Sequence, residues 1–112
     1  MNKTIEKLKD LGCDIDDAMT RFLDDEDFYL ECFDSVIHDV KFEELKQLVE
    51  QKDVEKAFEC AHTLKGLVAN IGLTSLYDIA VVIVEKLRAG SAEHLLEQCD
   101  ALLSEREKYL SV

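Results

Sequence analysis

The sequence predicts an all-α fold, and three observations support this prediction. Apolar residues recur three or four positions apart, the spacing of one helix face, over almost the whole chain. Proline is absent, so no proline interrupts a helix. Helical stretches also end at glycines, as at Gly12, Gly72 and Gly90, or begin at residues that cap helices well.

Two short helices are expected near the amino terminus. The first is predicted by Ile5, Leu8 and Leu11 and ends at Gly12. Asp14 is expected to cap the second. The apolar face of the second helix is expected to contain Ile15, Ala18, Met19, Phe22 and Leu23.

The stretch from Asp25 onward carries two apolar stripes. The first contains Tyr29, Phe33, Val36 and Val40. The second contains Phe42, Leu45 and Val49. On one straight helix these stripes would be rotated by about 140° from each other, so we expect a bend or break near Lys41.

A longer helix should follow Asp53, which is placed to cap it. Gly72 closes this helix, with Leu73 positioned for the apolar contact of a Schellman motif. The residues expected to face the core are Ala57, Phe58, Ala61, Leu64, Val68 and Ile71.

The next helix is predicted over residues 74–89, although its apolar run 79–84 alone could be a buried strand. The flanking residues keep helical spacing for about four turns, and no second strand is predicted to pair with it. Gly90 ends this helix and Ser91 is expected to cap the last one. The last helix should bury Leu95, Cys99, Leu102, Leu103 and Tyr109.

Short connections predict how these helices are arranged. Residues 51–53, 72–73 and 90–91 leave room only for antiparallel neighbours, so residues 41–112 should form an up-down-up-down four-helix bundle. Residues 1–40 should supply helices that pack on this bundle. All 112 residues then make one domain, and the starting methionine favours a free-standing protein.

The composition excludes several kinds of function. The formal charge is −12, and residues 14–27 hold seven acidic residues and one basic one, a surface that repels nucleic acid and anionic membranes. No apolar run suits a signal peptide or a membrane span. The four cysteines form no Cys-x-x-Cys pair, which favours reduced thiols. We expect a cytoplasmic monomer without nucleic-acid or membrane partners.

One glycine does not mark a helix end. Gly66 lies in the middle of the helix that follows Asp53, where glycine costs about 1 kcal/mol relative to alanine. His62 lies one turn earlier, about 120° from the centre of the apolar stripe, and Lys65 is three residues on. The histidine should therefore be exposed at the edge of the core.

Phosphoryl transfer through a phosphohistidine needs these three residue types. A neutral imidazole is a nucleophile near pH 7, and Lys65 can pair with phosphoryl oxygens. Gly66 removes the side chain that would block an approaching donor or acceptor. The candidate catalytic residues are thus His62, Lys65 and Gly66.

The chain resembles the histidine phosphotransfer (HPt) domains of bacterial multistep phosphorelays. The resemblance is carried by Ala61-His62-Thr63-Leu64-Lys65-Gly66, by residues 69–73, and by an opening over residues 12–29. It implies that His62 is the phosphoacceptor, that Lys65 stabilises the phosphoryl group and that Gly66 gives access. The family usually has a small residue after the glycine, where this chain has Leu67.

The resemblance also implies a phosphocarrier rather than an enzyme. Its partners would be receiver domains of response regulators or of hybrid histidine kinases, with magnesium held by the receiver and no cofactor of the chain's own. A histidine kinase would need an ATP-binding domain, and Thr63 stands where its acidic residue would follow the histidine.

Two alternatives stay open beside this interpretation. A scaffold without phosphotransfer would use the same helical surface. A metal-binding bundle would use Glu59 and His62 as a Glu-x-x-His pair, but it needs a second such pair on a facing helix. His38 lies near the predicted bend and His94 beside the predicted cap of the last helix, so neither is expected to supply that pair.

Overall fold

The computed structural model describes residues 3–112 and contains helices but no strand in that range. The all-α prediction is therefore confirmed. The helices are α1 (Lys3–Asp10), α2 (Ile15–Arg21), α3 (Glu26–Ile37), α4 (Lys41–Glu50), α5 (Val54–Asn70), α6 (Thr74–Arg88) and α7 (Leu96–Leu110). None of these helices is long and apolar enough to cross a lipid bilayer.

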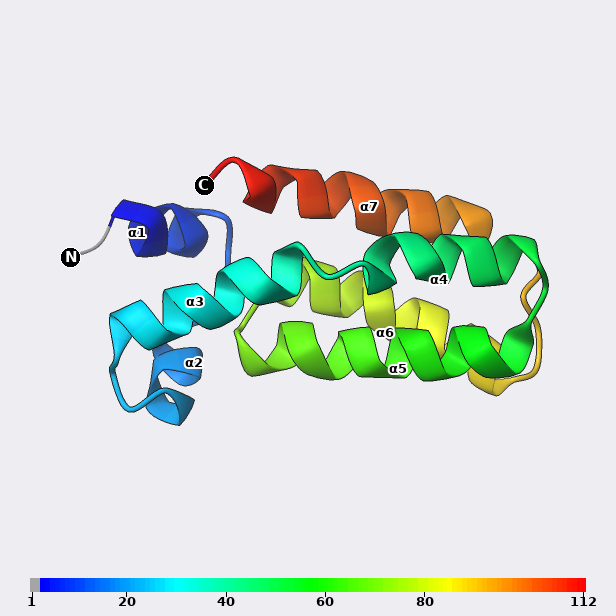
Figure 1. The fold of residues 1–112 in the computed structure, drawn as a ribbon, viewed down its shortest axis with the longest axis horizontal. Helices are drawn as coiled ribbons and strands as arrows, with labels where there is room; N and C mark the ends of the chain where they lie inside the picture. Colours follow the sequence, from blue (N-terminus) through cyan, green and yellow to red (C-terminus); the bar gives the residue numbers. More distant parts are fainter. Residues whose placement is uncertain (1–2) are drawn as a thin grey trace.

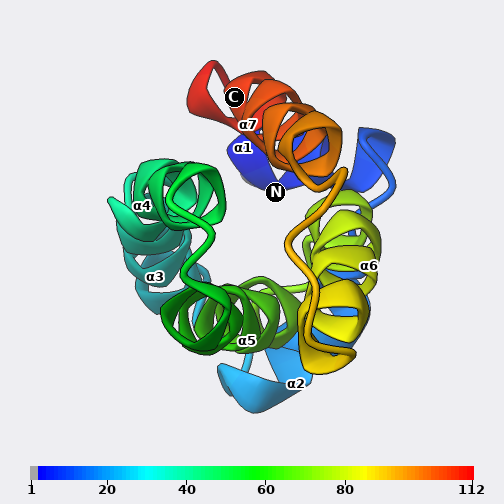
Figure 2. The same ribbon diagram turned by 90° about the vertical axis from the view of Figure 1, so that its right-hand side faces the viewer.

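Helices α4, α5, α6 and α7 surround a common core. Helix α5 packs against α4 and α6, and α7 also packs against α4 and α6. Viewed along the long axis of the molecule, the four helices lie around a shared centre (Figure 2). Helices α1, α2 and α3 lie at one end of this group of helices (Figure 1). The described part of the molecule as a whole measures 44 × 23 × 20 Å.

The predicted helix caps of α2 and α5 are present. The side chain of Asp14 accepts a hydrogen bond from the backbone N–H of Asp17, and that of Asp53 accepts one from Lys56, both at 3.2 Å. Asp25 caps α3 in the same way. Each aspartate satisfies one backbone donor that the first turn of a helix leaves without a partner.

The predicted break near Lys41 is also present. Helix α3 ends at Ile37, and α4 begins at Lys41, whose N–H donates to the carboxylate of Asp39 at 2.8 Å. Val40 was expected to continue the buried stripe of α3, and this expectation is wrong. Because it lies within the break, its side chain is 62% exposed.

A buried arginine stabilises this break. Arg106 of α7 donates a hydrogen bond to the carbonyl oxygen of Ile37 at 3.2 Å and pairs with the carboxylate of Glu43. Its guanidinium also lies 5.1 Å from the ring centroid of Phe42. These contacts tie α7 to both sides of the break. They join distant parts of the chain, so helical periodicity did not predict them.

Other expectations near helix ends are wrong. Helix α7 begins at Leu96, so Ser91 does not cap it. The Ser91 hydroxyl instead accepts the N–H of Glu93 in a turn, and His94 then adopts a left-handed backbone with φ +61°. Leu11 and Leu23 were expected on buried faces but are 39% and 87% exposed, because both lie beyond the ends of their helices.

Candidate functional site

The three candidate residues lie on one face of α5. His62 and Gly66 are exposed and Lys65 is half-buried, as their positions around the helix predict. Ala61 and Leu64 point the other way and are almost fully buried. The packing of these two residues fixes the rotation of α5, so His62 stays at the surface.

The backbone around Gly66 is open to solvent. A Cβ atom built at this position would meet no atom within 4 Å, apart from the backbone of the helix itself. Gly66 also has ordinary helical geometry, so neither packing nor backbone conformation requires glycine here. Leu67, the residue after it, is half-buried and packs against the core.

An aromatic ring lies next to His62, and a cation lies over that ring. The Phe58 ring, one turn earlier on α5, has its centroid 5.8 Å from that of the imidazole, and the two planes are tilted by 36°. The guanidinium of Arg88, the last residue of α6, lies 5.2 Å from the centroid of Phe58. Phe58 was expected to face the core and is half-buried, so it packs inward and borders the histidine at once.

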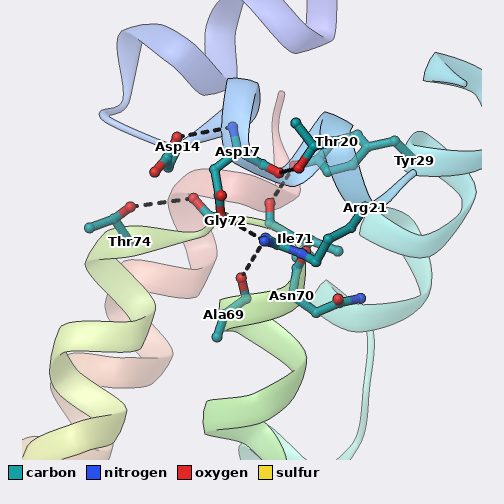
Figure 3. A network of polar contacts seen from close by, with 10 residues as sticks. All are labelled: Asp14, Asp17, Thr20, Arg21, Tyr29, Ala69, Asn70, Ile71, Gly72 and Thr74. Carbon is teal, nitrogen blue, oxygen red and sulfur yellow. Dashed lines mark hydrogen bonds and ion pairs between the residues drawn. The ribbon is translucent and has the colours of Figure 1, made fainter. Parts of the chain in front are cut away.

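The carboxyl-terminal end of α5 is anchored by side chains of other helices (Figure 3). Arg21 of α2 donates to the carbonyl oxygens of Asn70 at 3.0 Å and of Ala69 at 3.2 Å. The hydroxyl of Tyr29, from α3, donates to the carbonyl oxygen of Ile71 at 2.6 Å. The last carbonyls of a helix have no partner within it, so these bonds satisfy groups that would otherwise need water. Burial raises the pKa of Tyr29 and keeps its hydroxyl a donor.

The chain reverses direction at Gly72 through the predicted Schellman motif. The N–H of Gly72 donates to Ala69 and that of Leu73 to Val68, at 3.2 and 3.0 Å. The carbonyl oxygen of Gly72 accepts the N–H of Asp14 at 2.9 Å, which ties this turn to α2. Leu73 is fully buried. The end of α5 is thus held by α2, by α3 and by its own closing turn, whereas the face around His62 is exposed.

A metal-binding site within residues 3–112 would need several His, Cys, Asp or Glu side chains close together. No group of three or more His, Cys, Asp or Glu residues in that range could hold a metal ion, and Glu59 with His62 gains no partner pair. The four cysteines are free, and all but Cys32 are buried. Burial raises the pKa of the Cys60 and Cys99 thiols to about 11, so both stay protonated at neutral pH.

A model of the Hpt domain family matches residues 34–110, more than two thirds of the chain. The chain belongs to the Hpt domain family. The matched segment begins within α3, covers α4–α7 and includes His62, Lys65 and Gly66, while α1 and α2 lie outside it. No curated protein and no solved structure shows significant similarity to the chain.

Membership in the Hpt domain family agrees with the all-helical fold. Hpt domains carry phosphoryl groups in phosphorelay signalling, interact with receiver domains and are not kinases.

Proposed function

We propose that His62 accepts a phosphoryl group from the aspartyl phosphate of one receiver domain and passes it to the aspartate of another. The observation that carries this proposal is the exposed imidazole beside open space at Gly66, on a helix whose other face is fixed by the core. A receiver must bring its phosphoaspartate to the imidazole, and a bare helical surface permits that approach.

The transfer exchanges one bond to phosphorus for another. The lone pair of one imidazole nitrogen forms the N–P bond, the P–O bond to the aspartyl carboxyl breaks, and its electrons remain on the leaving carboxylate. The second ring nitrogen keeps its proton during the step. Transfer onward reverses these changes with a second aspartate. The magnesium ion that this chemistry uses would be held by the receiver, so the chain needs no cofactor of its own.

The other site residues have distinct proposed roles. Lys65 lies one turn beyond His62 and is half-buried. Its ammonium group would pair with the phosphoryl oxygens. Gly66 leaves room for the receiver. Residues 41–112 would present this site as an antiparallel bundle, with residues 1–40 packed at its end, in a cytoplasmic monomer.

Phosphate transfer from a labelled receiver domain tests this function. We expect the wild-type protein to take up acid-labile, base-stable phosphate from a panel of phosphorylated receivers in the presence of magnesium. His62→Gln should abolish uptake while circular dichroism and the melting temperature remain nearly unchanged, because His62 is exposed. The matched controls His38→Gln and His94→Gln replace the other two exposed histidines and should take up phosphate normally.

The same experiment separates this function from the alternative of a scaffold. A scaffold would bind a receiver but take no phosphate from it. Binding without uptake by every phosphorylated receiver would therefore contradict the phosphocarrier role and favour the scaffold.

A further inference from the structure

Phe58 of α5 lies between Arg88, which belongs to α6, and His62. Its ring contacts both side chains. The guanidinium carbon of Arg88 lies 5.2 Å from the Phe58 centroid, which lies 5.8 Å from the imidazole centroid. Taken together, these distances place the guanidinium within 11.0 Å of the imidazole. An arginine side chain can cover much of that gap by rotating about its own bonds.

The contacts that hold Arg88 are weak ones. More than half of its side chain is exposed, and its Nε atom lies 3.4 Å from the carboxylate of Glu85, which is exposed to a similar extent. Its guanidinium also lies over the face of the Phe58 ring, which carries no full charge. An exposed ion pair at this distance contributes little to stability. Arg88 can therefore leave both contacts when a stronger anion is close.

A phosphoryl group on His62 would be such an anion. It carries close to two negative charges, and arginine binds phosphoryl oxygens through two parallel, charge-assisted hydrogen bonds. The chain as a whole carries a formal charge of −12, and Glu59 lies one turn before His62 on an exposed part of α5. These carboxylates disfavour a further negative charge unless cations offset it.

Lys65 and Arg88 lie on opposite sides of His62 along the axis of α5. Lys65 lies one turn toward the carboxyl end of the helix, whereas the Phe58 ring that holds Arg88 lies one turn toward the amino end. The acidic Glu59 is also on the amino-terminal side of His62, whereas Lys65 is on the carboxyl-terminal side. A cation on the amino-terminal side would offset the negative charge of Glu59 and of the phosphoryl group there.

We propose that Arg88 is a second phosphoryl-binding residue, which rests on the Phe58 ring in the unphosphorylated protein and moves onto the phosphoryl oxygens of phosphorylated His62. This inference rests on the proposed function of His62 and adds to it a residue from α6. Phe58 has two roles in it. Its ring borders the imidazole, and it keeps the guanidinium near the site before phosphate arrives.

The equilibrium of phosphate between receiver and His62 tests the role of Arg88. At equilibrium, contacts that affect only docking or the transfer rate cancel, so the ratio of the phosphorylated forms reports how well each protein stabilises the group. Arg88→Ala should shift this ratio toward the phosphorylated receiver by about two- to fivefold, as expected for loss of one exposed charge pair. Arg88→Lys keeps the charge and should restore most of the wild-type ratio.

Lys86→Ala is the matched control. Lys86 is an exposed cation on the same last turn of α6, so its removal changes the net charge equally without touching Phe58. It should leave the equilibrium ratio unchanged. An equal shift in Lys86→Ala, or no shift in Arg88→Ala, would overturn the proposal for Arg88 while leaving the function of His62 intact. Wild-type protein that takes no phosphate on His62 would overturn both.

Discussion

Gly66 and Gly72 are six residues apart, one within α5 and one just past its end, yet the structure requires glycine only at the second. Gly72 has a left-handed backbone with φ +73°, and an added Cβ atom would collide with the backbone carbonyl of Asp14. At Gly66 the backbone is helical and the space around it is empty. The fold explains Gly72 but does not require glycine at position 66, which supports the proposed role of Gly66 in access to His62.

The same contrast separates the two regions of α5 that these glycines mark. Near Gly72, side chains from α2 and α3 satisfy successive backbone carbonyls and hold the end of the helix. Near Gly66, the exposed face of the helix carries His62 and is not covered by another helix. A helix that is fixed at one end and on its buried face can present an exposed nucleophile in one orientation. Substitutions near Gly72 should lower the stability of the fold but not the transfer rate. Substitutions near Gly66 should lower the transfer rate but not the stability.

The largest loss of stability is expected for Gly72→Ala. The strained left-handed backbone and the collision with Asp14 should lower the free energy of unfolding by about 2 kcal/mol or more. Gly12→Ala is a matched control, because Gly12 has φ +87° but open space around it, and it should lose only about 1 kcal/mol. Urea denaturation of both variants measures the difference. Equal losses would show that the contact with Asp14 contributes nothing.

A smaller loss is expected for Tyr29→Phe. Removing the buried hydroxyl leaves the Ile71 carbonyl without its 2.6 Å donor, which should cost about 1–2 kcal/mol at neutral pH. The transfer rate of the folded protein should not change. Transfer that falls in proportion to stability would contradict the separation of the two regions.

The pH dependence of this variant sharpens the test. Burial raises the pKa of Tyr29, so its contribution is complete below the unfolded pKa of about 10 and is lost as the pH rises above that value. The wild-type protein should therefore lose its advantage over Tyr29→Phe in alkaline solution. An advantage that stays constant to high pH would contradict the buried, protonated hydroxyl.

A gain in stability is expected at Gly66. Gly66→Ala should raise the free energy of unfolding by up to about 1 kcal/mol, since the helix gains propensity and the new methyl group meets no atom. Transfer should nevertheless fall, and Gly66→Leu should reduce it far more than any change in stability explains. A Gly66→Leu protein that transfers at the wild-type rate would remove access as the reason for the glycine.

The smallest change in stability is expected for Lys65→Ala. Lys65 is only half-buried, and alanine is a good helix former, so this substitution should leave the urea midpoint nearly unchanged. The transfer rate should fall by about fivefold without being abolished, because a partly screened cation stabilises phosphoryl charge only modestly. A wild-type rate would exclude Lys65 from the site.

Local signals in the sequence predicted much of this molecule. The aspartate caps at Asp14 and Asp53 and the glycine at Gly72 act on neighbouring backbone, so the residues and their spacing were sufficient. The exposure of His62 follows from its position relative to the apolar stripe. Ser91 was misread, because a serine after a glycine has the same local signature whether it caps a helix or a turn.

Contacts between distant helices could not be predicted in this way. Arg106 was not recognised as buried, because its partners Ile37 and Glu43 belong to another part of the chain. The contact of Arg88 with Phe58 was missed for the same reason. Periodicity reports which face of a helix is buried, but not which charged side chain of another helix reaches it.

Identification of the residue that becomes phosphorylated is the most direct test of the central claim. Trypsin cuts after lysine and arginine, so His38, His62 and His94 fall in three separate peptides, over residues 22–41, 57–65 and 89–106. Mass spectrometry of protein phosphorylated by a receiver, digested without acid, then assigns the group to one histidine. We predict phosphate on peptide 57–65 alone, with His62 modified. Phosphate on peptide 22–41 or 89–106, with peptide 57–65 unmodified, would contradict the account.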